Sequence, residues 1–303
     1  MSRGTAGLRL CALVLAALVL PARAAGDGDP WSAVVLPAAQ QLDVRAAASG
    51  HRYRIFVSVP DAPPPPSGYP VLYVLDGNAA FPVAAFLARR ATDRRDVTGH
   101  LPPLVVGIGY PGDADFDLDA RRRDYTVGAG ELGPPADEGG ADAFLDFIDH
   151  ELKPLIAARH PVDPSRQALF GHSFGGLFVL HALFTRPASF STYLASSPSI
   201  WWKDRQVLSG LPALANLRAV QPRVQISVGA LEDDPPRGKV PPEIRAIRAS
   251  RPMVSEARSL AARLREMPGW RARVAYHELA GEDHGPAWLP AMSRGLPFFL
   301  DQP

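Results

Sequence analysis

Residues 168–180 read ALFGHSFGGLFVL, and this stretch decides the fold. The apolar residues 168–170 have the character of a strand, the pentapeptide GHSFG follows at 171–175, and an apolar helical run comes next. A G-x-S-x-G pentapeptide in this strand-turn-helix context predicts that Ser173 is exposed on a sharp backbone turn. We expect both outer glycines to be required, because a side chain there would collide with the neighbouring strand or helix, and Gly176 adds room for close packing.

Strands and helices alternate outward from this turn. With the serine turn, short apolar strands separated by helices predict an α/β-hydrolase fold: a mainly parallel central sheet with helices on both faces. In such sheets ligands bind at the carboxyl ends of the strands. The proline run at 63–66 predicts a stiff turn between neighbouring strands. We expect strands at 53–59, 71–75, 104–108, 168–170, 193–195, 223–228 and 273–279, and helices near 81–90, 141–156, 253–267, from 174 and after the last strand.

Composition narrows the class of protein. The chain has 303 residues, of which 47% are hydrophobic and 21% charged, enough for one large core. Lys and Arg number 32 and Asp and Glu 31, and no basic run interleaved with aromatic residues occurs, so no nucleic-acid partner is expected. Because no Cys/His cluster has metal-ligand spacing, we expect no metal site and no cofactor.

The first residues have the pattern of a secretory signal peptide. Arg3 and Arg9 precede the apolar run 10–20, then Pro21 and the small-x-small triplet 22–24 follow. An N-terminal membrane anchor is the alternative, but the run is short for a bilayer. We therefore predict a signal peptide at 1–24 and a single exported domain at 25–303, with no stable membrane span after signal removal.

A serine hydroxyl needs a positioned imidazole to take its proton. His284 lies in the glycine-bounded loop 281–285, directly after the last predicted strand, and the chain order serine, acid, histidine requires a late histidine. His277 reads as a sheet residue, and His172 is adjacent to Ser173 but points elsewhere on a tight turn. His284 is therefore the predicted general base.

The acid that orients this imidazole should follow the preceding strand, where Glu232, Asp233 and Asp234 are consecutive. We predict Glu232, with the two aspartates as alternatives, and all three carboxylates could instead only solvate a loop. For the oxyanion we predict the backbone N–H groups of Phe174 and Asn78. Gly77 is the alternative to Asn78, and an ordinary turn is the alternative to an oxyanion site there.

Four segments carry a resemblance to a known family: 71–78, 121–126, 171–176 with 197–202, and 281–285. They read VLYVLDGN, RRRDYT, GHSFGG with SPSIWW, and GEDHG, in an order that resembles the putative-esterase (esterase D-like) family, and within it the enterobactin esterases and salmochelin trilactone hydrolases. The resemblance implies hydrolysis of a small-molecule ester, in these relatives the serine-trilactone backbone of a catecholate siderophore. It also implies a periplasmic location.

Carried over by position, Arg121 would face the anionic catecholate iron complex, and Trp201 and Trp202 would help to wall the site. His172 is the fourth predicted substrate-binding residue. Alternatively, Arg121 is a structural partner of Asp124, and one tryptophan belongs to the core.

One departure is that Val127 stands where the family has proline, which puts the shape of the substrate loop in question. The substrate could thus be a phenolic or short acyl ester. Acyl transfer to another acceptor and non-catalytic siderophore binding are the other functions that these residues allow.

Overall fold

A computed structural model describes residues 34–128, 138–217, 222–236 and 238–301. The fold described below lies in the unit Leu36–Pro303. The predicted signal peptide at 1–24 lies outside the described residues. Among the residues described, no helix is both long enough and apolar enough to cross a membrane.

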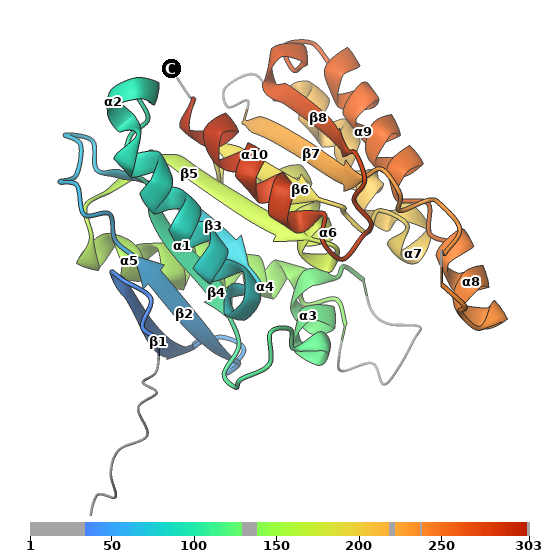
Figure 1. The fold of residues 1–303 in the computed structure, drawn as a ribbon, viewed down its shortest axis with the longest axis horizontal. Helices are drawn as coiled ribbons and strands as arrows, with labels where there is room; N and C mark the ends of the chain where they lie inside the picture. Colours follow the sequence, from blue (N-terminus) through green and yellow to red (C-terminus); the bar gives the residue numbers. More distant parts are fainter. Residues whose placement is uncertain (1–33, 129–137, 218–221, 237, 302–303) are drawn as a thin grey trace, which may run out of the picture. The chain divides into compact units, whose positions relative to one another are not determined.

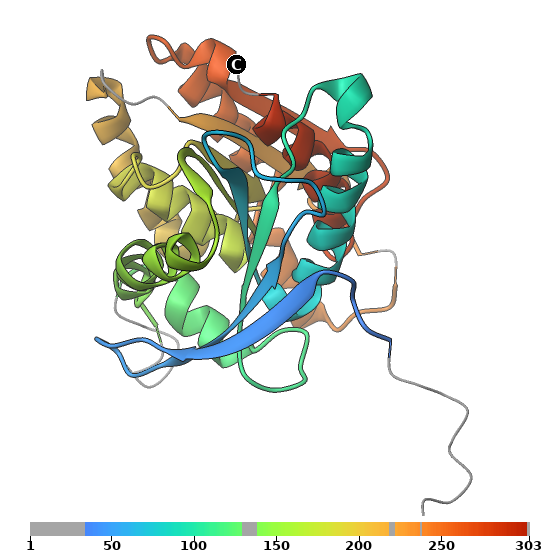
Figure 2. The same cartoon turned by 90° about the vertical axis from the view of Figure 1, so that its left-hand side faces the viewer.

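The described part of this unit is built on an eight-stranded, mainly parallel sheet in the order β1-β2-β4-β3-β5-β6-β7-β8 (Figure 1). Only β2 runs antiparallel to its neighbours β1 and β4, and β1 lies at one edge (blue in Figure 2). This is the mainly parallel sheet that the sequence predicts. The strands are β1 (Ala39–Arg45), β2 (Arg52–Ser58), β3 (Tyr69–Leu75), β4 (Leu104–Gly109), β5 (Val162–His172), β6 (Thr192–Ser196), β7 (Arg223–Gly229) and β8 (Val274–Leu279).

One prediction about the sheet is wrong. The proline-rich turn at 63–66 joins β2 to β3, but these strands are not neighbours, because β4 lies between them. All six residues of β4 are buried, so this strand needs a partner on each side and a helical layer on each face. The chain therefore crosses over through α1 and inserts β4 between β2 and β3.

Helices cover both faces of the sheet, as predicted. One apolar cluster joins α1 and α10 to one face, and a second joins α4, α5, α6 and α9 to the other (Figures 1 and 2). The helices are α1 (Gly77–Asp93), α2 (Arg95–Thr98), α3 (Leu118–Tyr125), α4 (Ala141–Phe147), the π-helical turn η2 (Ile148–Leu152), α5 (Lys153–Arg159), α6 (Phe174–Thr185), α7 (Trp202–Arg205), the 3-10 segments η3 (Gln206–Asn216) and η4 (Arg271–Arg273), α8 (Pro242–Ala249), α9 (Val254–Glu266) and α10 (Trp288–Leu300).

The sequence of strand β3 is a continuous apolar run because both of its faces are buried. Val71, Tyr73 and Leu75 belong to one cluster, whereas Leu72 and Val74 belong to the other. Successive side chains of a strand point to opposite faces, so a strand that is covered on both sides needs an apolar residue at every position. The same burial brings the end of β3 beside the end of β5, where the serine turn begins.

Candidate active site

Ser173 occupies a strained turn between β5 and α6, with φ 61° and ψ −118°. A Cβ at Gly171 would lie 2.3 Å from the carbonyl oxygen of Gly175, so glycine is required there, as predicted. The second required glycine differs from the prediction. A Cβ at Gly175 would meet its nearest atom at 3.5 Å, an ordinary contact, whereas at Gly176 it would lie 2.7 Å from the carbonyl oxygen of Ser196. Gly176, not Gly175, lets α6 approach β6.

Three loops at the carboxyl ends of the strands bring a serine, a histidine and a carboxylate into line. Nε2 of His284 lies 3.0 Å from Oγ of Ser173, and Nδ1 lies 2.6 Å from Oε2 of Glu232. Oε1 of Glu232 accepts hydrogen bonds from Oγ of Ser197 at 2.5 Å and from the backbone N–H of Gly229 at 2.7 Å. Both carboxylate oxygens are therefore held, with one directed at the imidazole.

The neighbouring carboxylates have other surroundings. Asp233 accepts the backbone N–H groups of residues 253–255 at 2.6 to 3.2 Å, so it satisfies the otherwise unbonded donors at the start of α9. Asp234 lines a separate cavity of about 400 Å³. Of the three predicted candidates, Glu232 is thus the one within hydrogen-bond distance of His284.

His172 packs against the ring of His284 and does not line the pocket that contains Ser173. Its Nδ1 is 3.0 Å from Oγ of Ser196, and its ring centroid is 4.7 Å from that of His284. Burial, followed by the nearby charges of His284 and Arg121, holds the pKa of His172 well below its usual range. The neutral ring of His172 therefore packs against the imidazole of His284 and helps to hold it in place.

Arg121, on α3, lines the pocket with its guanidinium tied to a buried carboxylate. Its Nε lies 2.7 Å from Oδ1 of Asp76, the residue that ends β3 and precedes α1. Burial alone would lower the pKa of Arg121, but Asp76 together with Tyr125 and Tyr110 outweighs that effect and raises it, so the guanidinium is cationic. The alternative pairing with Asp124 is wrong, because Asp124 binds the adjacent Arg123 at 2.8 Å.

The two predicted oxyanion donors both belong to first turns of helices. Phe174 opens α6 and lines the pocket, and Asn78 is the second residue of α1. The side chain of Asn78 accepts the backbone N–H of Tyr110 at 2.9 Å and donates to its carbonyl oxygen at 3.0 Å. These bonds hold the loop after β4 against the start of α1. The oxyanion role of the two backbone N–H groups stays a prediction.

The aligned side chains open into a pocket of about 300 Å³. Trp201 lines it, but Trp202 is buried and packs edge to face against Phe174 with ring centroids 5.0 Å apart. Only one of the two predicted tryptophans therefore forms the wall, and the other belongs to the core. The lining residues are Arg121, Ser173, Phe174, Ser199, Trp201, Glu232, Arg248, Arg251, Met253 and His284.

Sequence reasoning missed four of these lining residues. Met253 and Arg251 precede α9, Arg248 lies in α8, and Ser199 follows β6. The order of the strands could have indicated these residues. The loops after β6 and β7 lie at the carboxyl edge of the sheet, where ligands bind.

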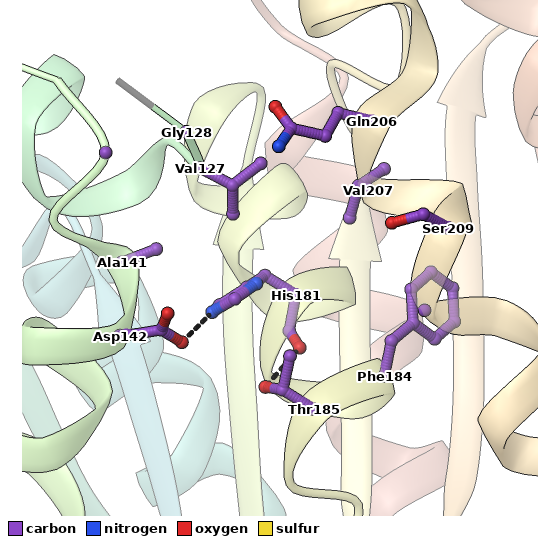
Figure 3. A pocket seen from close by; sticks show the side chains of 12 residues that line it. Val127, Gly128, Ala141, Asp142, His181, Phe184, Thr185, Gln206, Val207 and Ser209 are labelled. Carbon is purple, nitrogen blue, oxygen red and sulfur yellow. Dashed lines mark hydrogen bonds and ion pairs between the residues drawn. The ribbon is translucent and has the colours of Figure 1, made fainter.

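A second cavity, of about 230 Å³, is lined by residues of α4, the C-terminal half of α6 and η3 (Figure 3). In it His181 and Asp142 point toward each other, with Nε2 2.8 Å from Oδ1. It shares no lining residue with the pocket of Ser173. His181 thus links α6 to α4.

The sheet, the strained serine turn and the serine-histidine-carboxylate line define a carboxylic ester hydrolase of the α/β-hydrolase fold. Comparison with known proteins then identifies the family. The model of the family described as Putative esterase matches residues 46–298, and the chain belongs to this family.

Relatives and solved structures agree with that assignment. Ferri-bacillibactin esterase BesA of Bacillus subtilis is 34% identical over 285 residues, covering 90% of this chain and 93% of the relative. The siderophore triacetylfusarinine C esterase of Aspergillus fumigatus is 37% identical over 297 residues, covering 90% and 97% respectively. The structure of siderophore hydrolase EstB from Aspergillus nidulans matches with a TM-score of 0.77 at 34% identity, covering 90% of this chain and 97% of that one.

Proposed function

We propose that this esterase cleaves the ester backbone of a catecholate siderophore, with Ser173 as nucleophile, His284 as general base and Glu232 as the acid of the triad. The observation that carries the proposal is the line of polar atoms from Oγ of Ser173 through the imidazole to Glu232, with spacings of 3.0 and 2.6 Å. The names of the relatives, esterases of ferri-bacillibactin and of the siderophore triacetylfusarinine C, support a siderophore substrate.

In the proposed reaction, Nδ1–H of His284 donates a hydrogen bond to the Glu232 carboxylate and keeps its proton, so Nε2 is free to accept the hydroxyl proton of Ser173. The serine oxygen forms a bond to the ester carbonyl carbon. The alcohol then leaves with the proton that His284 returns to it. A water molecule attacks the acyl-enzyme by the same route and releases the carboxylic acid. Each cleaved ester consumes one water molecule, and the proposal includes no cofactor.

The negative charge that develops on the carbonyl oxygen needs donors that are already in place. We assign this role to the backbone N–H groups of Phe174 and Asn78. Phe174 directly follows the nucleophile, and both residues stand in the first turn of a helix, where N–H groups have no partner within the helix. The positive ends of α6 and α1 would add to the stabilisation of the oxyanion.

For the substrate we assign direct contact to Arg121 and Trp201, which line the pocket. A guanidinium pairs with phenolate oxygens, and an indole offers a flat apolar face to an aromatic ring. Trp202 and His172 would not contact the substrate. Trp202 would support Phe174, and His172 would support His284.

We also propose that residues 1–24 direct export and that the domain at 25–303 acts in the periplasm. The basic start, the apolar run at 10–20 and the small residues before position 25 support this proposal. Cell fractionation with N-terminal sequencing tests it. A mature protein that begins at residue 25 in the periplasmic fraction is the expected result, and an uncleaved chain in the cytoplasm would contradict it.

The function is tested by incubating the mature protein and Ser173→Ala with iron-loaded and iron-free enterobactin, triacetylfusarinine C, a simple triacyl ester and a feruloyl ester. Products are resolved by mass, and thermal unfolding checks that the variant is folded. We expect linearised trilactone with the wild type and none with the variant.

Other outcomes would replace parts of the proposal. Cleavage of only the simple or the feruloyl ester would overturn the substrate, and unchanged turnover in Ser173→Ala would overturn the nucleophile. Tight binding without turnover would indicate a binding protein, and transfer to an added alcohol in place of water would indicate an acyltransferase.

A further inference from the structure

The segment between β7 and α9 brings two arginines to the pocket that the sequence analysis did not predict. Arg248 lies near the end of α8 and Arg251 just after it, and both line the pocket of Ser173. No residue of α8 is buried, and Figure 1 shows this helix beyond the ends of β7 and β8. A helix without a buried face gains little stability from core packing. Core packing therefore does not explain why this segment lies at the pocket.

The guanidinium of Arg251 is held in place against an aromatic wall. Its Cζ lies 4.2 Å from the centroid of the Trp201 ring, and its backbone N–H donates to the carbonyl oxygen of Arg248 at 3.0 Å. Two residues later, the N–H of Met253 donates to Asp233 at 2.6 Å. The backbone is therefore anchored on both sides of Arg251, and the attraction between the guanidinium and the indole ring holds the side chain against Trp201.

The charges around the pocket are unequally compensated. Asp76 neutralises Arg121 at 2.7 Å, and Asp283 pairs with Arg248 at 3.1 Å. Within the described ranges, no carboxylate lies at ion-pair distance from Arg251. Glu232, the acid that lines the pocket, is bonded to His284. Arg251 is thus a cation at the pocket wall whose charge is available to a ligand.

The geometry suits an anionic group. The N–H donors of a guanidinium lie in its own plane and point outward from its edges. When its face packs on an aromatic ring, these donors stay available to carboxylate, sulfonate or phenolate oxygens. Stacking also fixes the plane of the side chain before the ligand arrives, which lowers the entropy that binding costs.

We infer that Arg251, stacked on Trp201 and supported by Arg248, recognises negative charge on the substrate and makes the enzyme prefer anionic esters to neutral ones. The inference rests on the proposed function, because it assigns a specificity to the same pocket. In a catecholate complex the phenolate charges exceed the charge of the ferric ion that they hold, so the iron-loaded ester is anionic. The enzyme therefore prefers the iron-loaded siderophore to the protonated, iron-free one.

The test compares two pairs of substrates that differ in charge: 4-sulfophenyl acetate with phenyl acetate, and iron-loaded with iron-free enterobactin. For each protein we take the ratio of kcat/KM for the charged ester to that for the neutral ester. Comparing this ratio between proteins cancels the different intrinsic reactivities of the esters. The proteins are the wild type, Arg251→Gln, Arg251→Lys and the control Arg245→Gln, which removes the same charge from an exposed position on α8 outside the pocket.

In Arg251→Gln we expect the ratio to fall about tenfold or more relative to Arg245→Gln, since a hydrogen bond to a charged group contributes about that factor. Arg251→Lys keeps the charge but loses the planar fork, so its ratio should fall less. Added salt should lower the ratio in the wild type more than in Arg251→Gln.

Equal ratios in Arg251→Gln and Arg245→Gln would overturn the inference and leave the proposed function intact. If the wild type cleaves aryl acetates but no trilactone, the proposed substrate fails, and the two aryl esters alone then decide the role of Arg251.

Discussion

Oγ of Ser197 donates a hydrogen bond of 2.5 Å to Oε1 of Glu232. Ser197 is fully buried and has a left-handed backbone with φ 41°, a conformation that costs a non-glycine residue of order 1–3 kcal/mol. With one carboxylate oxygen held in this way, the other faces His284 at 2.6 Å. Ser197 thus acts as a positioning residue for the proposed acid of the triad.

We predict that Ser197→Ala lowers kcat about tenfold with little change in KM, because a hydrogen bond to a charged group contributes about 1.5–3 kcal/mol and Gly229 remains as a second donor to Glu232. Steady-state kinetics on a chromogenic ester measure this effect. In a Glu232→Gln background the same substitution should have a smaller effect. An equal effect in both backgrounds would show that Ser197 does not act through Glu232.

The neighbouring acids offer a matched comparison. We predict that Glu232→Gln lowers kcat on the order of 10³-fold or more, because a neutral amide neither stabilises the imidazolium nor holds the correct tautomer of His284. Asp233→Ala should change kcat far less. It should instead reduce the free energy of unfolding by about 1–2 kcal/mol, since the first N–H groups of α9 lose their acceptor. Kinetics and urea denaturation of both variants check the pair, and a reversed pattern would assign the acid to Asp233.

The two glycines after the nucleophile should differ in their tolerance of a methyl group. Gly176→Ala places Cβ 2.7 Å from the carbonyl oxygen of Ser196, which also accepts the backbone N–H of Ser173. We expect this variant to lose about 1–3 kcal/mol of stability and to lose activity. Gly175→Ala meets only ordinary contacts and should keep its stability, because alanine favours a helix over glycine. Thermal unfolding of the two variants tests the difference, and equal losses would refute it.

Burial of neutral His172 predicts a dependence of stability on pH. The ordinary pKa of 6.5 applies in the unfolded chain, whereas burial lowers the pKa of His172 well below it in the fold. The unfolded state therefore binds the extra proton first as the pH falls. The stability that His172 contributes is present above about pH 6.5 and is lost below it.

Between pH 7.5 and 5.0 we expect the wild type to lose up to about 2 kcal/mol more stability than His172→Asn, in which the side chain at position 172 no longer titrates. Urea denaturation at the two values measures the difference. Parallel losses in both proteins would mean that His172 titrates equally in the folded and unfolded states.

Elements with a buried face could be predicted from the sequence, and elements without one could not. Strands β3 and β4 are apolar throughout, and α6 is buried on nearly all sides, so their patterns are strong. Strand β1 is mostly exposed, and α8 has no buried residue, its Ile244 and Ile247 being exposed, so neither belongs to the core. The charged helix α3 has little apolar periodicity, and the sequence analysis predicts no helix at its residues.

The sequence by itself determined the fold class and predicted Ser173 as the nucleophile and His284 as the base, because the serine turn and the apolar strands are local patterns and the order of the loops follows from them. Only the tertiary structure decided which carboxylate faces His284, that Asp76 pairs with Arg121, and that Arg251 stacks on Trp201. Each of these pairs joins residues far apart in the chain, and neighbouring acids or arginines look alike in sequence. Their roles depend on distances of a few ångströms, which the packing of the loops sets.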